Sequence, residues 1–279
     1  MKSLVALYRS PTYSPQQHRQ NDTAILDETV ERLSGRGWAV RKTSETDVVA
    51  GRLPPADLYV NMCQGAAASE RLMRLVPLEA MAVNPPASVL NCHRHRLVER
   101  MADAGLPFPR TLILPTSEPQ AAALIVHLLN GDGRPVWVKR GDVHAETRAD
   151  VVSAKEATVI DAIADFARRG VARVALQAHV PGPILKFYAV ADGSFFHWYP
   201  ADGGQAVVNE ERLRALVFAA ARALALEVFG GDVAVPQPDA PVLIDINDWP
   251  SFAPFREEAA QAIAAYVLDR VAQRREPSD

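Results

Sequence analysis

Two aspartates and an asparagine near the end of the sequence have a spacing suited to metal binding. Asp245 and Asn247 follow an apolar run that begins at Val242, and a spacing of two places both on one face of a strand. Asp232 lies in an earlier apolar run, and the turn-forming segment 236–241 joins the two runs. A hairpin symmetric about this segment pairs Asp232 with Asp245. Carboxylate and amide oxygens gathered without Cys or His suit Mg²⁺ or Mn²⁺, commonly shared with nucleotide phosphates.

Both aspartates also have an ordinary structural interpretation. Asp232 could form a turn and Asp245 could cap the end of its strand, as aspartates commonly do. The convergence of three oxygen-bearing side chains favours the metal site. A second cluster, Cys92, His93 and His95, has a poor spacing for zinc, because two histidines two residues apart on a helix point to nearly opposite sides.

The segment after the metal pattern must turn the chain back toward its last helix. Pro250 favours an extended backbone at Trp249, which would hold the indole and the Ser251 hydroxyl at the mouth of the site. Trp249 could equally be a packing residue.

Lys139 is the candidate for a phosphate contact in the middle of the chain. It shares a face of the predicted strand 136–140 with Trp137, and the polar segment 141–145 follows directly. A lysine on a strand is usually a surface residue that extends its amine to water. The polar segment that follows favours instead a loop that folds over phosphates.

Length and composition are those of an ordinary globular protein. The 279 residues are 48% hydrophobic and 23% charged, which leaves room for one large domain or two to three lobes. The net charge of −3 provides no polybasic surface, so we expect neither nucleic acid nor a membrane as partner. Two cysteines, a short apolar start and the lack of a bilayer-length apolar run predict a cytoplasmic protein.

The pattern of apolar residues predicts two architectures in succession. Strands at 4–7, 38–40 and 58–60 alternate with helices, the first of which is expected to begin after a cap at Asp22 or Thr23. This alternation predicts a parallel sheet with right-handed crossovers through about residue 86.

The remainder of the chain reads as α+β structure. One helix is expected over 89–104, ending at Gly105, and a small α+β unit follows. Beyond it, a tight turn joins the predicted strands 184–190 and 195–199, which indicates a hairpin and an antiparallel sheet. Further helices are predicted over residues 117–129, 155–168, 210–227 and 256–272.

Five segments, in this order and spacing, resemble the ATP-grasp superfamily. The resemblance covers about residues 86–275, and the pattern is most similar to the peptide-forming glutamate ligases and the inositol polyphosphate kinases of this fold. The segments are Asn91–Arg96 with Ala104–Thr111, Val136–Lys139, Leu176–Gly182 with Lys186, Gly231–Asp232, and Ile244–Asn247 with Pro250.

The resemblance implies an N-terminal parallel α/β lobe, followed by an ATP-grasp fold of two α+β lobes that clamp the nucleotide. The N-terminal domain would span residues 1–86 and the ATP-grasp domain residues 87–279. Within the latter, a small lid lobe would occupy about 111–178 and a C-terminal lobe about 179–275.

The resemblance also assigns site residues. Asp232, Asp245 and Asn247 would hold Mg²⁺ or Mn²⁺. Arg94, Lys139 and Lys186 would be the catalytic residues, with Lys139 in contact with the ATP phosphates and Lys186 near phosphate or substrate. Arg94 stands where many members have a lysine, and the segment 141–147 has one glycine where many have several, so the contacts of that loop stay open. The residues implied to bind ATP are Arg94, Lys139, Gln177, Ala178, His179, Val180 and Lys186.

The function implied is that of an ATP-dependent carboxylate–amine ligase acting on small-molecule or peptide substrates. A carboxylate would be phosphorylated to an acylphosphate, which an amine then attacks. Two alternatives are a small-molecule kinase of the same fold, disfavoured because the N-terminal lobe has no lysine cluster, and an ATP-binding module without turnover, disfavoured because the metal triple is complete. The acceptor, the amine and the oligomeric state are left open, with a homodimer as one option.

Overall fold

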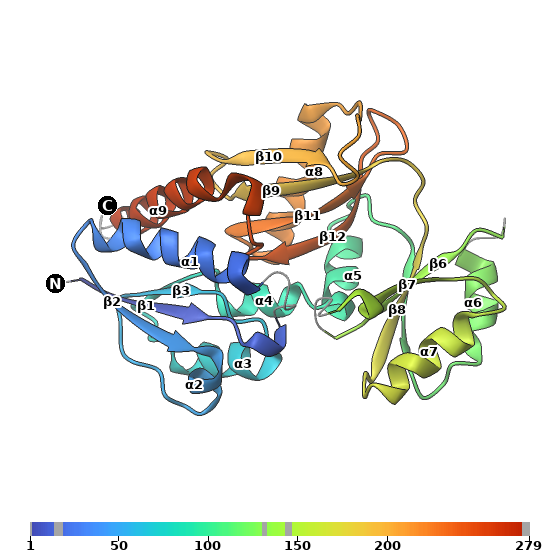
Figure 1. Cartoon of the computed structure of the whole chain (residues 1–279), viewed down its shortest axis with the longest axis horizontal. Coiled ribbons are helices and arrows are strands. Elements are labelled where there is room, and N and C mark those ends of the chain that lie inside the picture. The colour runs from blue at the N-terminus through green and yellow to red at the C-terminus, as the bar shows by residue number, and fades with distance from the viewer. Residues whose placement is uncertain (1, 14–18, 130–132, 143–146, 275–279) are drawn as a thin grey trace.

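Three sheets of four strands carry the described part of the chain (Figure 1). Their strand orders are β2-β1-β3-β4, β5-β8-β6-β7 and β10-β9-β11-β12, here named the N-terminal, middle and C-terminal sheets. None of the described helices is both long and apolar enough to cross a bilayer. The computed structural model describes all residues except 1, 14–18, 130–132, 143–146, 275–279 and the side chain of Arg148.

The N-terminal sheet is parallel throughout, as predicted. Strand β1 (Lys2–Tyr8), one of the two inner strands, has apolar residues on both faces. Leu4 and Ala6 pack in one core cluster, and Val5 and Leu7 pack in another. Figure 1 shows α1 and α9 side by side over one face and α2 and α3 over the other. The elements are β1 (Lys2–Tyr8), η1 (Pro11–Tyr13), α1 (Arg19–Ser34), β2 (Trp38–Ser44), α2 (Glu45–Val49), β3 (Leu58–Asn61), α3 (Ala66–Leu75), β4 (Met81–Val83) and the C-terminal helix α9 (Arg256–Gln273).

The first helix begins earlier than the sequence predicts. Helix α1 already includes Asp22 in its first turn, so a cap at Asp22 or Thr23 is wrong. The carboxylate of Asp22 instead accepts a hydrogen bond from the guanidinium of Arg9 at 3.2 Å. A charged partner across the loop therefore explains the aspartate that had indicated a helix start.

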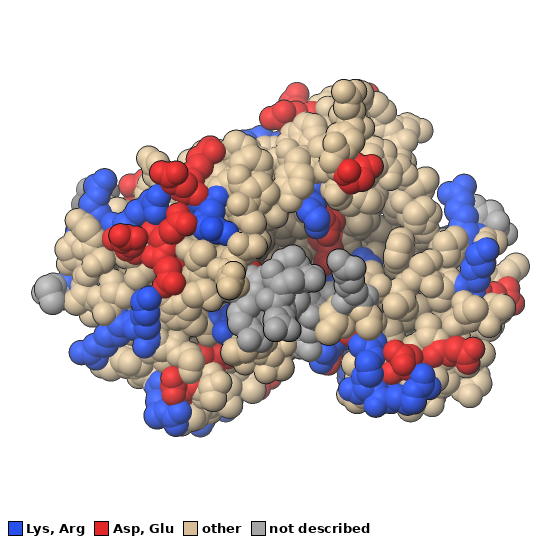
Figure 2. All heavy atoms as spheres, in the orientation of Figure 1, with Lys and Arg blue, Asp and Glu red and all other residues tan. Residues whose placement is uncertain are grey.

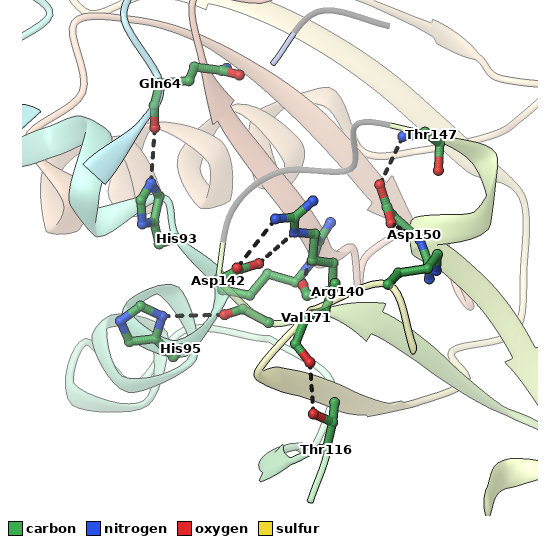
Figure 3. Close-up of polar contacts among 12 residues, drawn as sticks. Gln64, His93, His95, Thr116, Arg140, Asp142, Thr147, Asp150 and Val171 are labelled. Carbon is green, nitrogen blue, oxygen red and sulfur yellow. Dashed lines mark hydrogen bonds and ion pairs between the residues drawn. The ribbon is translucent and has the colours of Figure 1, made fainter. Parts of the chain in front are cut away.

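The predicted helix 89–104 is two helices, α4 (Pro86–Asn91) and α5 (Arg94–Asp103). The chain is non-helical at His93, whose ring bonds the carbonyl of Gln64 at 3.1 Å (Figure 3). This contact with the N-terminal lobe accompanies the break, and the break places Arg94 in the first turn of α5.

The middle sheet is antiparallel, and its two faces differ. One face packs Val138 and Leu176 against the two helices of this lobe. The other face carries Trp137, Lys139 and Gln177, which line a cavity. The elements are β5 (Thr111–Pro115), α6 (Ala121–Leu129), β6 (Val136–Arg140), η2 (Arg148–Asp150), β7 (Val151–Ala154), α7 (Val159–Arg168) and β8 (Arg173–Ala178).

The C-terminal sheet is also antiparallel, and it contains the predicted pairing of Asp232 with Asp245. One face packs residues such as Phe187 and Ile246 against α5 and α8. The opposite face packs Tyr188 and Val190 in the core that includes α9, and beyond them it carries polar side chains. The elements are β9 (Ile184–Val190), β10 (Phe196–Pro200), α8 (Glu210–Leu224), β11 (Val228–Ala234), β12 (Val242–Asp248) and η3 (Ala253–Phe255).

Trp249 is a packing residue. Its side chain is fully buried, and its indole nitrogen donates to the carbonyl of Val83 at 3.3 Å. The backbone has a positive φ of 37°, so the predicted extended geometry and the placement at the mouth of the site are wrong. Pro250 excludes the ordinary helical region at Trp249, but burial of the large indole against the N-terminal sheet selects a left-handed backbone rather than an extended one.

Each sheet falls within one of the predicted domain ranges, and on that basis we propose the boundaries 1–86 and 87–279, with lobes at about 111–178 and 179–275. The two domains share a core, because α9 packs on the N-terminal sheet in the same cluster as α1. The last helix therefore attaches the C-terminal lobe to the N-terminal lobe.

Candidate active site

A cavity of about 290 Å³ lies between the middle and C-terminal sheets. Figure 2 shows the surface hollowed at this place, with acidic and basic side chains inside the hollow. One end of the lining is apolar and the other is charged, as a site for a nucleobase and phosphates requires. The lining residues are Trp137, Lys139, Val151, Gln177, Ala178, His179, Val180, Gly182, Ile184, Asp232, Ile244 and Asp245.

The three candidate metal ligands lie on the polar face of the C-terminal sheet. Asp232 on β11 is directly opposite Asp245 on β12, and Asn247 follows in register with Gly230. The register shifts beyond Asp232, so that Ile244 is the extra residue of a bulge next to the two carboxylates.

The side-chain oxygen of Asn247 provides an observation that fits a metal ion. It is buried and has no hydrogen-bond partner within the described part of the chain. A buried amide oxygen without a partner costs free energy, so such an atom in a native fold requires an explanation. Two facing carboxylates beside it make a set of hard oxygen donors, which suits Mg²⁺ or Mn²⁺.

Arg94 holds one of these carboxylates. One guanidinium nitrogen donates to Asp245 Oδ2 at 2.8 Å, and the other terminal nitrogen donates to the carbonyl of Arg140 at 3.1 Å. The side chains of Arg94 and Asp245 are only 6% and 15% exposed. Helix α5, the middle sheet and the C-terminal sheet therefore meet at this guanidinium.

Lys186 holds the other carboxylate. Lys186 lies on β9, directly opposite Asp232 on β11, and its ammonium is 2.9 Å from Asp232 Oδ1. Burial alone would lower the pKa of Lys186, but the negative charge of Asp232 raises it above the ordinary value. Lys186 is therefore charged at neutral pH.

Lys139 lies in the cavity and not at the surface. Its side chain is buried and its ammonium donates to the carbonyl of Ile244 at 3.3 Å. Burial lowers the pKa of Lys139 from 10.5 to about 8; Asp245 opposes this shift and the positive charge of Arg94 adds to it. The bulge at Ile244 thus supplies a backbone acceptor for a buried cation.

The apolar end of the cavity contains a hydrogen-bonded aromatic pair. The indole nitrogen of Trp137 donates to Nδ1 of His179 at 3.2 Å, which leaves the proton of the neutral imidazole on Nε2. The side chain of Gln177 reaches the carbonyl of Ile244 at 3.5 Å, the long limit of a hydrogen bond.

The structure brings all the predicted site residues into one region. Arg94 and Lys186 lie beside the cavity, each in an ion pair with an aspartate of the cavity wall. Asn247 lies on the same face of β12 as Asp245. The roles assigned to these residues stay predictions. The predicted residues that line the cavity itself are Lys139, Gln177, Ala178, His179, Val180, Asp232 and Asp245.

The sequence prediction of the site missed five further residues that line the cavity: Trp137, Val151, Gly182, Ile184 and Ile244. Gly182 had a readable signal, because a proline–glycine pair marks a turn. It has φ of 111°, and a Cβ there would lie 2.3 Å from the carbonyl oxygen of Val235. Ile244 had none, because a bulge cannot be located from apolar alternation alone.

The segment after Lys139 is anchored at its start (Figure 3). Gly141 donates to the carbonyl of Arg173 at 2.9 Å, and a Cβ on Gly141 would lie 2.8 Å from that oxygen. Its own carbonyl is bonded by the ring of His95 at 3.3 Å, and Asp142 pairs with Arg140 at 2.6 Å. The single glycine of the predicted phosphate loop thus serves a close backbone approach, while residues 143–146 lie outside the described chain.

The Cys92, His93 and His95 cluster is not arranged around a common point. The two rings bond different carbonyls and their centroids are 6.3 Å apart, and burial raises the pKa of the Cys92 thiol. Across the described residues, no three His, Cys, Asp or Glu side chains are grouped to hold a metal ion. The candidate metal set above depends on an asparagine as its third member.

No protein-family model matches the sequence, and a search of curated proteins finds no significant match. Solved structures, in contrast, align over nearly the whole chain. A D-alanine–D-alanine ligase from Bacillus anthracis in complex with ATP aligns 98% of this chain with 96% of its own, at TM-score 0.71 and 12% identity. A RimK-domain ATP-grasp protein from Sphaerobacter thermophilus aligns 95% with 99%, at TM-score 0.66 and 18% identity.

A third structure, the D-cycloserine synthetase DcsG, aligns 95% of this chain with 99% of its own, at TM-score 0.66 and 17% identity. At these identities the likeness establishes the fold and no more. The alignments extend across all three sheets described above, including the two that face each other across the cavity. The chain therefore has the ATP-grasp fold.

Proposed function

We propose that this protein is an ATP-dependent carboxylate–amine ligase. The observation that carries the proposal is the charged end of the cavity, where Lys139, Asp232 and Asp245 line the wall. The side-chain oxygen of Asn247, which has no partner among the described residues, lies on the same sheet face. The ligases and synthetases among the structures of the same fold support the class of reaction, and their substrates are not transferred to this chain.

ATP is the proposed cosubstrate, with its base at the apolar end of the cavity. Backbone groups of Ala178 and Val180, where β8 leaves the middle sheet, are proposed to bind the base edge. Trp137 and His179 form a rigid wall, because their mutual hydrogen bond fixes both rings. The triphosphate would then extend toward Lys139 and the two carboxylates.

Mg²⁺ or Mn²⁺ would be held by Asp232, Asp245 and Asn247, and when bound would neutralise charge on the phosphates. Lys139 contributes a second positive charge from the opposite sheet. Its position in the cavity wall allows it to contact the γ-phosphoryl group as charge develops on the transferring oxygens.

The reaction proposed has two steps. A carboxylate oxygen of the acceptor attacks the γ-phosphorus and ADP leaves, which forms an acylphosphate. An amine then attacks the acyl carbon, loses a proton, and inorganic phosphate leaves. The residues described position and neutralise charge without supplying a covalent nucleophile, and both cysteines are buried with their thiol pKa raised.

The test uses the purified chain with ATP, Mg²⁺ and a panel of amino acids and other carboxylates, with hydroxylamine as a trap for the acylphosphate. A ligase forms ADP, phosphate and a hydroxamate with its correct carboxylate, and Asp245→Asn lowers the rate of formation of all three products on the order of 10³-fold. A stable phosphorylated product that forms without any amine would establish a kinase and refute the ligase assignment.

A further inference from the structure

We propose that Arg94 makes metal binding depend on nucleotide binding. In the free protein its guanidinium holds Asp245, and when a nucleotide enters it transfers from that carboxylate to phosphate, which releases Asp245 to the metal ion. The inference rests on the proposed function, because it concerns the same nucleotide and metal site.

The first step is that each carboxylate is already held by a positive charge through one of its oxygens. Asp245 is bonded by Arg94 at 2.8 Å, and Asp232 by Lys186 at 2.9 Å. A divalent ion that approaches the free protein must therefore compete with two positive charges already in place. The competition is strongest at Asp245, because its ion pair is the more buried of the two.

The second step is that the guanidinium can release Asp245 and keep its bond to Arg140. Arg94 donates through one terminal nitrogen to the carbonyl of Arg140 and through the other to Asp245. The first bond ties it to the residue directly after Lys139. A guanidinium presents several N–H donors in a fixed fork and pairs well with phosphate, so the second nitrogen can turn from carboxylate to phosphate.

The third step is that Lys139 and Arg94 lie at the same place in the site, so that a phosphate at Lys139 is within reach of Arg94. Arg94 bonds the carbonyl of the residue directly after Lys139, and the ammonium of Lys139 bonds the carbonyl of the residue directly before Asp245. The positive charge of Arg94 also contributes to the lowered pKa of Lys139. An anion that contacts Lys139 therefore relieves the repulsion between the two cations. It also offers Arg94 a replacement for Asp245.

The consequence is a positive coupling between the two ligands. If nucleotide draws Arg94 away from Asp245, metal affinity rises by the same factor by which metal raises nucleotide affinity, because such coupling is reciprocal. The free protein should therefore bind divalent ions weakly despite its facing aspartates.

The first experiment measures Mn²⁺ binding to the nucleotide-free protein by electron paramagnetic resonance of free Mn²⁺. Arg94→Met should bind Mn²⁺ about tenfold more tightly than the wild type, because Asp245 is released. The matched control is Arg96→Met, an exposed arginine two residues further along α5, which should bind Mn²⁺ as the wild type does. Equal Mn²⁺ affinity in the wild type and Arg94→Met overturns the proposal.

The second experiment is a double-mutant cycle on binding of the ATP analogue adenylyl imidodiphosphate in EDTA. Asp245→Asn frees Arg94 from its ion pair, so the single variant should bind the analogue about tenfold more tightly than the wild type. In the Arg94→Met background the same change should have a much smaller effect. An equal gain in both backgrounds indicates simple charge repulsion between Asp245 and phosphate and overturns the exchange.

Wild-type measurements separate this proposal from the proposed function. If the wild type fails to bind the analogue even with Mg²⁺, the ATP site itself is wrong. If it binds the analogue with Mg²⁺ and also binds Mn²⁺ equally well without nucleotide, the ATP site stands and only the role of Arg94 is refuted. This comparison requires no variant, so an unstable Arg94→Met cannot leave the question open.

Discussion

The N-terminal sheet and the cavity between the other two sheets bury side chains for different purposes. In β1, four successive apolar residues are fully buried, two on each face. At the cavity, the sheets instead enclose Lys139, Arg94 and Asp245, whose removal from water is costly. The first region therefore stabilises the fold through apolar burial. The second keeps charged side chains buried at a cost in free energy, and the proposed binding of nucleotide and metal ion accounts for their presence.

The comparison predicts that variants of the two regions fail in different ways. The largest effect on turnover is expected for Asp245→Asn, which removes one charged oxygen donor and the partner of Arg94. ATP hydrolysis or ligation should fall on the order of 10³-fold, the upper scale for loss of one electrostatic group, while the melting temperature changes little.

Steady-state release of ADP and a thermal melt on the same sample check this prediction. The matched control is Asp239→Asn, an exposed aspartate in the turn of the same hairpin, which should keep full turnover. Substantial turnover by Asp245→Asn at ordinary Mg²⁺ concentrations would mean that the metal site is misplaced.

The opposite result is expected in the N-terminal sheet for Leu7→Ala. Its side chain is fully buried, and a leucine-to-alanine change in a core costs about 2–5 kcal/mol of unfolding free energy. The nucleotide affinity of the folded fraction should be unchanged, because Leu7 packs in a cluster that contains none of the cavity residues.

Denaturant titration of Leu7→Ala beside Leu78→Ala tests this difference. Leu78 is 90% exposed, so its removal should leave the unfolding free energy nearly unchanged. A large loss of nucleotide affinity in folded Leu7→Ala would show that the two regions are not independent.

The same contrast explains what the sequence could predict. The alternation of predicted strands with helices indicated the parallel sheet, and a turn-rich connector predicted the pairing of Asp232 with Asp245, because both depend on local patterns. The superfamily pattern assigned Arg94 to the reacting phosphates, and neither it nor the local sequence predicted the ion pair with Asp245. The hydrogen bond from Arg94 to Asp245 joins residues 151 positions apart in the sequence, and local sequence patterns cannot predict a contact between such distant residues.

The errors came from residues whose local signal was overridden by tertiary packing. The type and position of Asp22 are typical of a helix cap, but its carboxylate forms an ion pair with Arg9 inside the first turn of the helix. Trp249 precedes a proline and was expected to be extended, but burial of its indole selects a left-handed backbone. Local propensities of this kind amount to about 1 kcal/mol, less than the burial of a large aromatic side chain provides.

Lys139→Ala should have an intermediate effect that is confined to the nucleotide site. Loss of the cation should remove about 2–4 kcal/mol of transition-state stabilisation, which is measured as a fall in kcat/KM for ATP. Stability should not fall in parallel, because removing a desolvated charge also removes its burial cost. The control is Lys155→Ala, an exposed lysine of the same lobe. Unchanged kcat/KM in Lys139→Ala would reduce Lys139 to a structural residue.

The smallest effect expected is a pH dependence of nucleotide binding that distinguishes Lys139 from the other cations of the site. Burial lowers the pKa of Lys139 to about 8, whereas Asp232 raises the pKa of Lys186 above its ordinary value. As pH rises through 8, Lys139 therefore loses its proton first, and nucleotide must supply the free energy to protonate it again. Above that pKa, the dissociation constant of adenylyl imidodiphosphate should rise up to about tenfold per pH unit, which corresponds to about 1.4 kcal/mol. Calorimetric titration between pH 7 and 9.5 measures this slope. Lys139→Arg should flatten the slope because a guanidinium stays charged throughout that range, and a slope that persists in Lys139→Arg would assign the pH dependence to another group.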